Sequence, residues 1–241
     1  MGELKFLTIK NMTDTTADLY FYGDIVSDWW GAWQDEDQYP DNIKNFLSGC
    51  VGKDLNVYVN SGGGSVFAGI AIYNMIKRHA QNQKVKVHVD GLAGSIASLL
   101  PFAGSEKPVI PSNAFMFIHN PWTNVDGNAE QLRKTADDLD QIREGIINIY
   151  MDHVKEGITR DTIVSMMDKE TWLNGAEAAE YFDIEPSQAV EAVAAAGDYM
   201  KWCKNAPETI RSRKTGQQEA MDKKKRELIN KAYVRALGRG E

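Results

Sequence analysis

The sequence predicts an α/β domain in which strands alternate with helices along the chain and run parallel in one sheet. Apolar stretches of strand length alternate with segments whose apolar residues recur at helical spacing. Three short motifs rich in small or polar residues follow expected strands, at residues 60–64, 91–95 and 119–121. Open α/β sheets bind their ligands at such strand ends, so the same pattern locates a candidate site.

The N-terminal part is expected to contain three strands and one short helix. A polar turn at residues 11–15 separates the first two strands, and Gly23 with Asp24 ends the second. A loop over residues 27–41 holds three tryptophans and many acids. The expected elements are strands over 4–10, 17–22 and 55–60 and a helix over 42–47 that ends near Gly49.

The second part continues the alternation and adds one long helix. Apolar residues at helical spacing predict a helix over residues 66–78, and small or apolar residues over 95–102 predict a buried one. The other expected elements are strands over 85–89, 107–110 and 114–118, a long amphipathic helix over 128–155, and short helices over 161–167 and 176–181.

Composition divides the chain into a domain over residues 1–195 and a basic tail over residues 196–241, which is expected to be helical or disordered. The densest basic cluster is at residues 223–226, and residues 219–237 could form a helix. A solvated tail is the plainer interpretation, and a partner-binding appendage is the alternative. Nucleic-acid binding by the tail would rest on charge alone.

The composition also limits the class of protein. The chain has 241 residues, of which 43% are hydrophobic, and a net charge of −7, which disfavours nucleic acid as the main partner. Its two cysteines, Cys50 and Cys203, form no disulfide or zinc pattern. No apolar run has the length of a signal peptide or a membrane span. We therefore expect a cytoplasmic protein without membrane contact, metal or cofactor.

Three motifs together supply what acyl transfer by a serine requires. Residues 60–64 read Asn-Ser-Gly-Gly-Gly and offer backbone N–H groups for an oxyanion. Ser95 lies among small residues at an expected strand-to-helix junction, where a helix N-terminus favours negative charge. His119 ends an apolar strand, where it could take the serine proton. The combination predicts a serine hydrolase, and we interpret it as a peptidase.

Each of these residues also has an interpretation without catalysis. Ser95 could be the N-cap of the following helix, and the glycine loop could be a tight turn or a phosphate-binding loop. Ser98 is expected to be a buried packing residue. His79 and His88 are expected to be surface or packing residues, and His153 to be solvated.

An acid should orient the imidazole and stabilise its charged form. Asp168 and Glu170 are the candidates, just before Thr-Trp-Leu at residues 171–173. If this stretch is extended, both side chains share a face, so spacing does not separate them. Both could equally be charges that cap a helix end.

At these residues the chain resembles the ClpP family of self-compartmentalising serine peptidases, over residues 19–186. The narrower resemblance is to ClpP-related head maturation proteases of tailed phages and prophages, carried by residues 67–74, 119–122 and 170–173. The wider match rests on four segments. Residues 60–64 are similar to the family's Asn-Ser-Pro-Gly-Gly, and residues 171–178 are similar to the segment after the family's catalytic aspartate. Residues 91–95 are similar to its nucleophile motif, and residues 118–121 to its histidine motif.

The resemblance implies a ClpP/crotonase-like superhelical stack of β-β-α units, with a protruding handle helix from about Asn128 and a charged C-terminal tail. It implies that Ser95 is the nucleophile and His119 the general base. The amides of Gly64 and Ile96 would form the oxyanion hole.

Two positions depart from the family's pattern. Gly62, which with Gly63 would bind substrate, stands where the family usually has proline. Glu170 stands in the place of the aspartate, so either Glu170 or Asp168 could complete the triad.

The expected function is therefore that of a serine endopeptidase acting through an acyl-enzyme, in phage capsid (prohead) maturation or in general Clp-type proteolysis. The expected partners are protein or peptide substrates and further copies of the chain in a homo-oligomeric ring, such as stacked heptamers. Capsid or scaffold proteins, or an ATP-dependent unfoldase, are further possible partners. The setting would be the cytoplasm of a phage-infected or prophage-carrying bacterium, or the prohead. The alternatives are an inactive ring or scaffold subunit and a crotonase-like acyl-CoA enzyme, since that related fold also uses backbone amides as an oxyanion hole.

Overall fold

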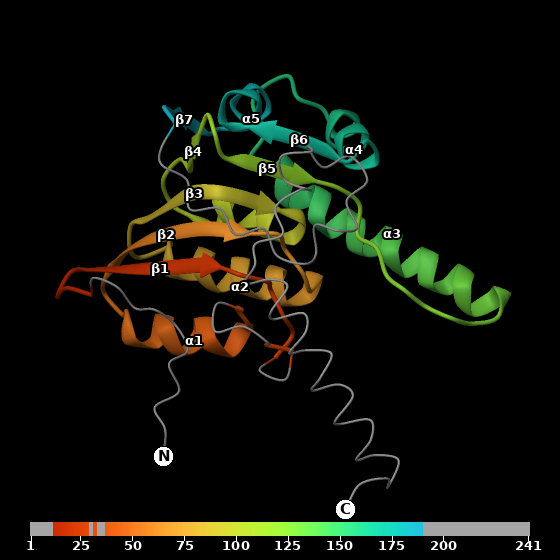
Figure 1. The fold of residues 1–241 in the computed structure, drawn as a ribbon, viewed down its shortest axis with the longest axis horizontal. Helices are drawn as coiled ribbons and strands as arrows, with labels where there is room; N and C mark the ends of the chain where they lie inside the picture. Colours follow the sequence, from red (N-terminus) through yellow and green to blue (C-terminus); the bar gives the residue numbers. More distant parts are fainter. Residues whose placement is uncertain (1–11, 29–30, 33–36, 190–241) are drawn as a thin grey trace, which may run out of the picture. The chain divides into compact units, whose positions relative to one another are not determined.

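The computed structural model describes residues 12–28, 31–32 and 37–189. The strand expected over 4–10, part of the tryptophan loop, and the tail with its expected helix and boundary lie outside the described residues. The described part forms a seven-stranded sheet with helices packed against it (Figure 1). The predicted α/β fold class is confirmed.

The sheet is built almost entirely from parallel strands. Every pairing is parallel except that of β5 with β6. The strand order is β1-β2-β3-β4-β7, while β5 pairs with the carboxyl end of β3 and β6 pairs with β5. The strands are β1 (Thr16–Tyr22), β2 (Asp54–Ser61), β3 (Val85–Gly94), β4 (Val109–Pro111), β5 (Phe115–Ile118), β6 (Thr171–Asn174) and β7 (Glu185–Ser187).

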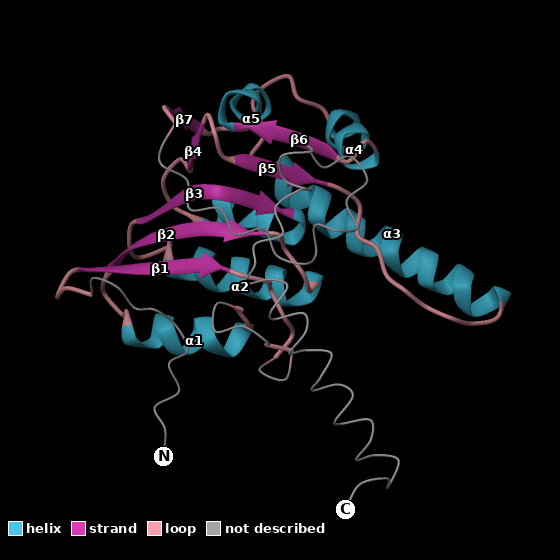
Figure 2. Ribbon diagram, in the orientation of Figure 1, coloured by secondary structure: helices cyan, strands magenta, loops and turns pink. Residues whose placement is uncertain are grey.

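Helices cover the sheet, and one of them extends away from it. Figure 2 shows α1 and α2 next to β1 and β2, and α2 also packs against the 3₁₀-helix. The long helix α3 starts at a capping box formed by Asn128 and Gln131 and projects beyond the sheet (Figure 1). No helix in the described part is long and apolar enough to span a bilayer. The helices are α1 (Pro40–Gly49), α2 (Val66–His79), the 3₁₀-helix (Ser95–Ala103), α3 (Ala129–Met151), α4 (Arg160–Asp168) and α5 (Gly175–Tyr181).

Three features differ from the elements expected from sequence. The segment expected as a helix over 95–102 is a 3₁₀-helix that contains Pro101, whose missing N–H disfavours a regular α-helix. Helix α3 ends at Met151, before residue 155, because Val154 already pairs with Phe182. Strand β7 was not expected and an extended stretch at β6 was only left open, since each strand is only a few residues long and pairs with a strand that is distant in sequence.

The carboxyl ends of β2, β3 and β5 bring the three motifs to one edge of the sheet. Strand β2 leads into the glycine loop, β3 into Ser95 and β5 into His119. The pairing of β2 with β3 shifts register between Val59 and Ser61, just before the loop. Parallel strands thus place a hydroxyl, an imidazole and loop amides beside one another.

Candidate active site

Ser95 occupies a strained turn between β3 and the 3₁₀-helix. Its φ is +53°, a left-handed conformation that is unusual for a residue other than glycine. The N-cap of the 3₁₀-helix is Gly94, so Ser95 is not the N-cap that the sequence left open. Strain at a strand-to-helix junction is a known way to expose a nucleophilic hydroxyl.

The imidazole of His119 lies against this hydroxyl. Its Nε2 is 2.7 Å from the Oγ of Ser95, a hydrogen-bonding distance. The ring of Phe117 stacks on the imidazole with centroids 4.9 Å apart, and Trp172 of β6 stacks on Phe117 at 4.3 Å. Burial lowers the pKa of His119 to about 4, although Glu170 opposes the shift. The imidazole is therefore neutral at pH 7 and can accept the serine proton.

Asp168, one of the two candidate acids, is engaged elsewhere. It is the last residue of α4, so the stretch is not extended there and the shared face considered from sequence does not form. Its carboxylate accepts hydrogen bonds from Nη2 of Arg143 at 2.6 Å and Nδ2 of Asn120 at 2.9 Å. These contacts tie the base of α3 to α4 and to the loop after His119.

Glu170, the other candidate, is brought near His119 by the pairing of β5 with β6. Ile118 of β5 pairs with Thr171 of β6 in antiparallel fashion, so His119 and Glu170 are the residues that adjoin this pair on the same side. Glu170 has a φ of +52° just before β6. Its carboxylate is also the charge that raises the pKa of His119 against the effect of burial. The geometry therefore favours Glu170 over Asp168 as the acid near the imidazole.

The glycine loop is folded closely against the turn at Ser95. Gly63 and Gly64 have φ values of +101° and +143°. A Cβ on Gly63 would lie 2.6 Å from the Cβ of Ser95 and 3.1 Å from the N of Ile96, so only bare backbone can approach this far. Gly62 lies beside Gly94, because a Cβ added to Gly94 would lie 3.2 Å from the carbonyl oxygen of Gly62.

Ile25, which lies between β1 and the loop over residues 27–41, fixes the orientation of the glycine loop. Its N–H donates to the carbonyl of Gly63 at 2.8 Å, and its own carbonyl accepts from the N–H of Ser65 at 2.7 Å. Because a trans peptide is planar, the Gly64 N–H points away from the Gly63 carbonyl that Ile25 holds. This directs the Gly64 amide away from Ile25.

A cavity of about 260 Å³ opens at Ser95 and His119. Gly64 and Ile96, the two residues expected to form the oxyanion hole, both line it. Sequence reasoning missed the apolar part of its wall, formed by Val66, Trp122, Ile146 and Tyr150. The last two lie four residues apart on α3, so their common helix face was visible in sequence, but only the fold brings that face to Ser95.

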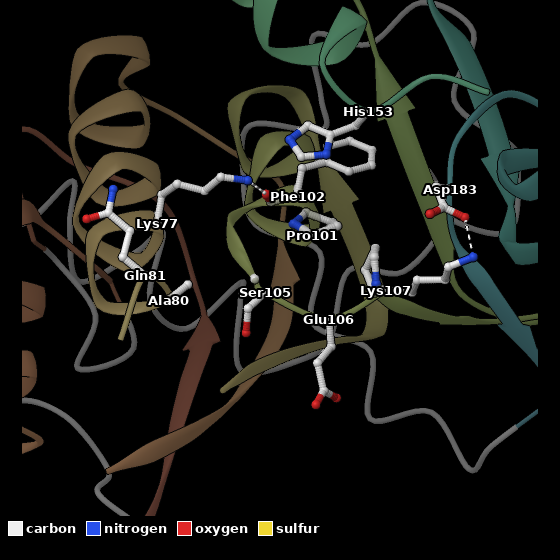
Figure 3. A pocket seen from close by; sticks show the side chains of 12 residues that line it. Lys77, Ala80, Gln81, Pro101, Phe102, Ser105, Glu106, Lys107, His153 and Asp183 are labelled. Carbon is white, nitrogen blue, oxygen red and sulfur yellow. Dashed lines mark hydrogen bonds and ion pairs between the residues drawn. The ribbon is translucent and has the colours of Figure 1, made fainter. Parts of the chain in front are cut away.

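A larger cavity of about 560 Å³ lies away from this site, between the end of α2 and the loop after the 3₁₀-helix (Figure 3). The ring of His153 stacks on Phe102 at 5.0 Å, and Nζ of Lys77 donates to the Phe102 carbonyl at 3.2 Å. His153 is half-buried, so the expectation that it is solvated is wrong. Over the described ranges, no group of three His, Cys, Asp or Glu side chains is placed to hold a metal ion.

Protonation of His153 should weaken the fold at acidic pH. Burial and then the nearby Lys77 lower its pKa to about 4, below the value of about 6.5 for an unfolded chain. The unfolded state therefore binds the proton more tightly, and the free energy of unfolding falls as pH drops from about 6.5 to about 4. Urea unfolding across this range should show a smaller fall in His153→Gln. Equal falls in both proteins would contradict this assignment.

The sheet is mostly parallel, and a serine–histidine pair lies at its carboxyl edge beside the amides of the glycine loop. This arrangement is typical of serine hydrolases. The chain belongs to the Clp protease family, because the family model described as Clp protease matches residues 46–182, more than half of its length.

Curated relatives of known name agree with this family. The chain is 33% identical over 132 residues to an ATP-dependent Clp protease proteolytic subunit of Bacteroides fragilis, a match that covers 54% of this chain and 61% of the relative. Similar subunits of Bacteroides thetaiotaomicron and Porphyromonas gingivalis are 32% and 31% identical over the same length, covering 54% of this chain and 58% and 57% of the relatives. The matched part thus spans about three-fifths of these relatives.

Proposed function

We propose that the protein is a serine endopeptidase that hydrolyses peptide bonds through an acyl-enzyme. The observation that supports this most is the 2.7 Å contact between the Ser95 hydroxyl and the His119 imidazole at the wall of an open cavity. A neutral imidazole at hydrogen-bonding distance is what a serine needs to become a nucleophile. The same contact favours a peptidase over a crotonase-like acyl-CoA enzyme, which does not require this pair, and over an inactive scaffold.

In this mechanism the Ser95 Oγ attacks the peptide carbonyl while Nε2 of His119 takes its proton. The oxyanion is held by the N–H groups of Gly64 and Ile96, and Glu170 stabilises the imidazolium. His119 then donates the proton to the leaving amine. Water, deprotonated by His119, attacks the acyl-enzyme and releases the new carboxyl end.

The apolar side of the cavity suggests a preference at the bond to be cut. An apolar substrate side chain next to Ser95 would be buried against Val66, Ile146 and Tyr150. Removing its apolar surface from water would stabilise the bound substrate. The substrate backbone would run extended along the glycine loop at Gly62 and Gly63, with main-chain hydrogen bonds providing affinity without strong sequence choice.

Assembly into a ring is the quaternary structure we propose. Most of the N-terminal part of α3 is exposed, and Leu132 on this helix is 44% exposed despite its apolar side chain. A helix that leaves the sheet with apolar surface uncovered is suited to pair with further copies of the chain. The solution mass of the full chain, measured by sedimentation equilibrium, tests this assembly and gives the ring size.

The biological setting we propose is phage capsid maturation, with general Clp-type proteolysis as the second candidate. The first follows from the sequence resemblance to phage head maturation proteases and would make capsid or scaffold proteins the substrates, inside the prohead. The second follows from relatives named as proteolytic subunits of an ATP-dependent protease and would add an unfoldase partner. Proteolysis of prohead proteins without any ATPase would favour the first.

A fluorophosphonate probe tests the nucleophile directly. Such a probe reacts with an activated serine hydroxyl and should modify the wild-type chain at Ser95, as located by peptide mapping, because His119 removes its proton. Ser95→Ala should not be labelled, and heat-unfolded wild-type protein should lose labelling as well. Equal labelling of the wild type and Ser95→Ala would refute the proposed function.

A further inference from the structure

Two buried hydroxyl groups form a chain that ends on the backbone of Ser95. The Oγ of Ser98 donates a hydrogen bond to the carbonyl oxygen of Ser95, and it lies 2.6 Å from the hydroxyl of Tyr150. Ser98 is 0% exposed and Tyr150 2% exposed, so water does not compete for these bonds. The expectation that Ser98 is buried is confirmed, but its side chain makes specific polar contacts.

The direction of each hydrogen bond in this chain follows from the groups involved. A carbonyl oxygen can only accept, so the single hydroxyl proton of Ser98 goes to Ser95. The Tyr150 hydroxyl must then donate to the Ser98 Oγ. Burial raises the pKa of Tyr150, which keeps the phenol protonated and able to donate at any working pH. The donor order is therefore Tyr150 to Ser98 to Ser95.

The peptide bond held by this chain is the one that supplies an oxyanion-hole donor. The carbonyl of Ser95 and the N–H of Ile96 belong to one planar unit and point in opposite directions. Holding the carbonyl toward Ser98 therefore holds the Ile96 N–H on the opposite side, and Ile96 lines the catalytic cavity. The 3₁₀-helix also restrains this carbonyl, so the Ser98 hydroxyl adds to an existing restraint.

We propose that Ser98 and Tyr150 are positioning residues that fix the Ser95–Ile96 peptide in the orientation required for oxyanion binding. The inference rests on the proposed peptidase function. Its basis is that Ser95 has a φ of +53°, a strained conformation that needs restraint, and that both Ser98 and Tyr150 are buried. A buried hydroxyl pair costs stability unless every bond is made, which suits a positioning role better than simple packing.

The arrangement also connects the catalytic cavity to α3. The aromatic ring of Tyr150 is enclosed by Phe102 at 6.3 Å and Phe182 at 5.9 Å between centroids, which fixes its hydroxyl. Tyr150 lies in the last turn of α3, the helix whose other end leaves the sheet. A displacement of the base of this helix would therefore move a donor that orients the Ser95–Ile96 peptide.

The experiment compares Ser98→Ala, Tyr150→Phe and the double variant in hydrolysis of a fluorogenic peptide. Deleting a whole oxyanion donor costs about 10²- to 10³-fold in kcat, and here the donor is only misdirected, so we expect about a tenfold loss in Ser98→Ala. Tyr150→Phe keeps the ring and should lose about threefold, since Ser98 can still reach Ser95. Because Tyr150 acts through Ser98, the double variant should match Ser98→Ala and not show the product of the two losses.

A second measurement separates positioning from mere loss of stability. A peptide aldehyde forms a tetrahedral adduct whose oxygen occupies the oxyanion hole, so its inhibition constant should weaken with kcat, while KM should change by less than about twofold. Tyr73→Phe is the matched control, because it removes the hydroxyl of another buried tyrosine. That hydroxyl lies 3.4 Å from Nε2 of His153, and Tyr73 does not line the catalytic cavity. This variant should leave kcat and aldehyde inhibition unchanged.

The outcomes distinguish this inference from the proposed function. If the wild type hydrolyses peptide, Ser95→Ala does not, and Ser98→Ala keeps both wild-type kcat and wild-type aldehyde inhibition, the positioning role is refuted. Additive losses in the double variant would refute the proposed order of donors. If the wild type shows no serine-dependent turnover at all, the proposed function is refuted, and the positioning role with it.

Discussion

Glu170→Gln is expected to lower kcat/KM for peptide hydrolysis by about 10³- to 10⁴-fold, the scale seen when the acid of a serine triad becomes an amide. Glutamine keeps the size and shape of the side chain but removes the negative charge. The imidazolium that forms when His119 takes the Ser95 proton would then lose its stabilising partner. Steady-state kinetics with a fluorogenic peptide measures the effect.

Asp168→Asn is the matched control for this prediction. Its carboxylate interacts with Arg143 and Asn120, so its loss should lower kcat/KM by only a few-fold, through a looser contact between α3 and α4. A large loss in Asp168→Asn together with a small one in Glu170→Gln would reverse the assignment of the acid.

The pH profile provides a readout that a purely structural role of Glu170 would not change. Glu170 raises the pKa of His119 against a larger lowering by burial, which leaves a value of about 4. Activity requires neutral His119 and should fall on the acidic side near that pH rather than near 6.5. In Glu170→Gln the residual activity should fall at a still lower pH, because the carboxylate charge that raises the pKa of His119 is gone. An acidic limb at the same pH in both proteins would contradict this coupling.

The sequence predicted that Ser95 and His119 lie together but did not separate the two candidate acids, for a physical reason. Ser95 and His119 each follow a strand with a clear apolar pattern, and parallel strands deliver their ends to one edge. The acid depends on β6, a four-residue strand whose antiparallel pairing with β5 leaves no periodic signal in the sequence. Spacing alone could not show that Asp168 ends a helix while Glu170 directly precedes β6, beside the pair of Ile118 and Thr171.

The same distinction applies to the rest of the fold. Elements with long periodic patterns, such as α2 and β2, were found close to their observed bounds. Contacts between distant segments were not predicted, which is why Ile25 and Tyr150 were missed. Ile25 holds the glycine loop by its backbone, and Tyr150 contacts Ser98 from α3. Local propensity contains no information about either contact.

Gly64→Ala is expected to lower kcat/KM by at least about 10²-fold, because it displaces a backbone donor of the proposed oxyanion hole. An added Cβ would lie 2.0 Å from the carbonyl oxygen of Ile25, and the φ of +143° is one that alanine rarely adopts. Neither the loop nor Ile25 can keep its position, so the Gly64 N–H should turn away from Ser95. Thermal unfolding should also occur at a lower temperature, since the strain weakens the packing around Ile25.

Gly175→Ala separates loss of the oxyanion hole from general damage to the fold. Its added Cβ would also lie 2.0 Å from a backbone oxygen, that of Ile110, so the clash is of equal size. Gly175 follows β6 at the end remote from His119, because Asn174 pairs with Phe115 while Thr171 pairs with Ile118. Both variants should unfold at a lower temperature, but below that temperature Gly175→Ala should retain turnover and fluorophosphonate labelling, and Gly64→Ala should not. Equal activity in the two folded variants would mean that the Gly64 amide does not bind the oxyanion, and the mechanism would then need a different second donor.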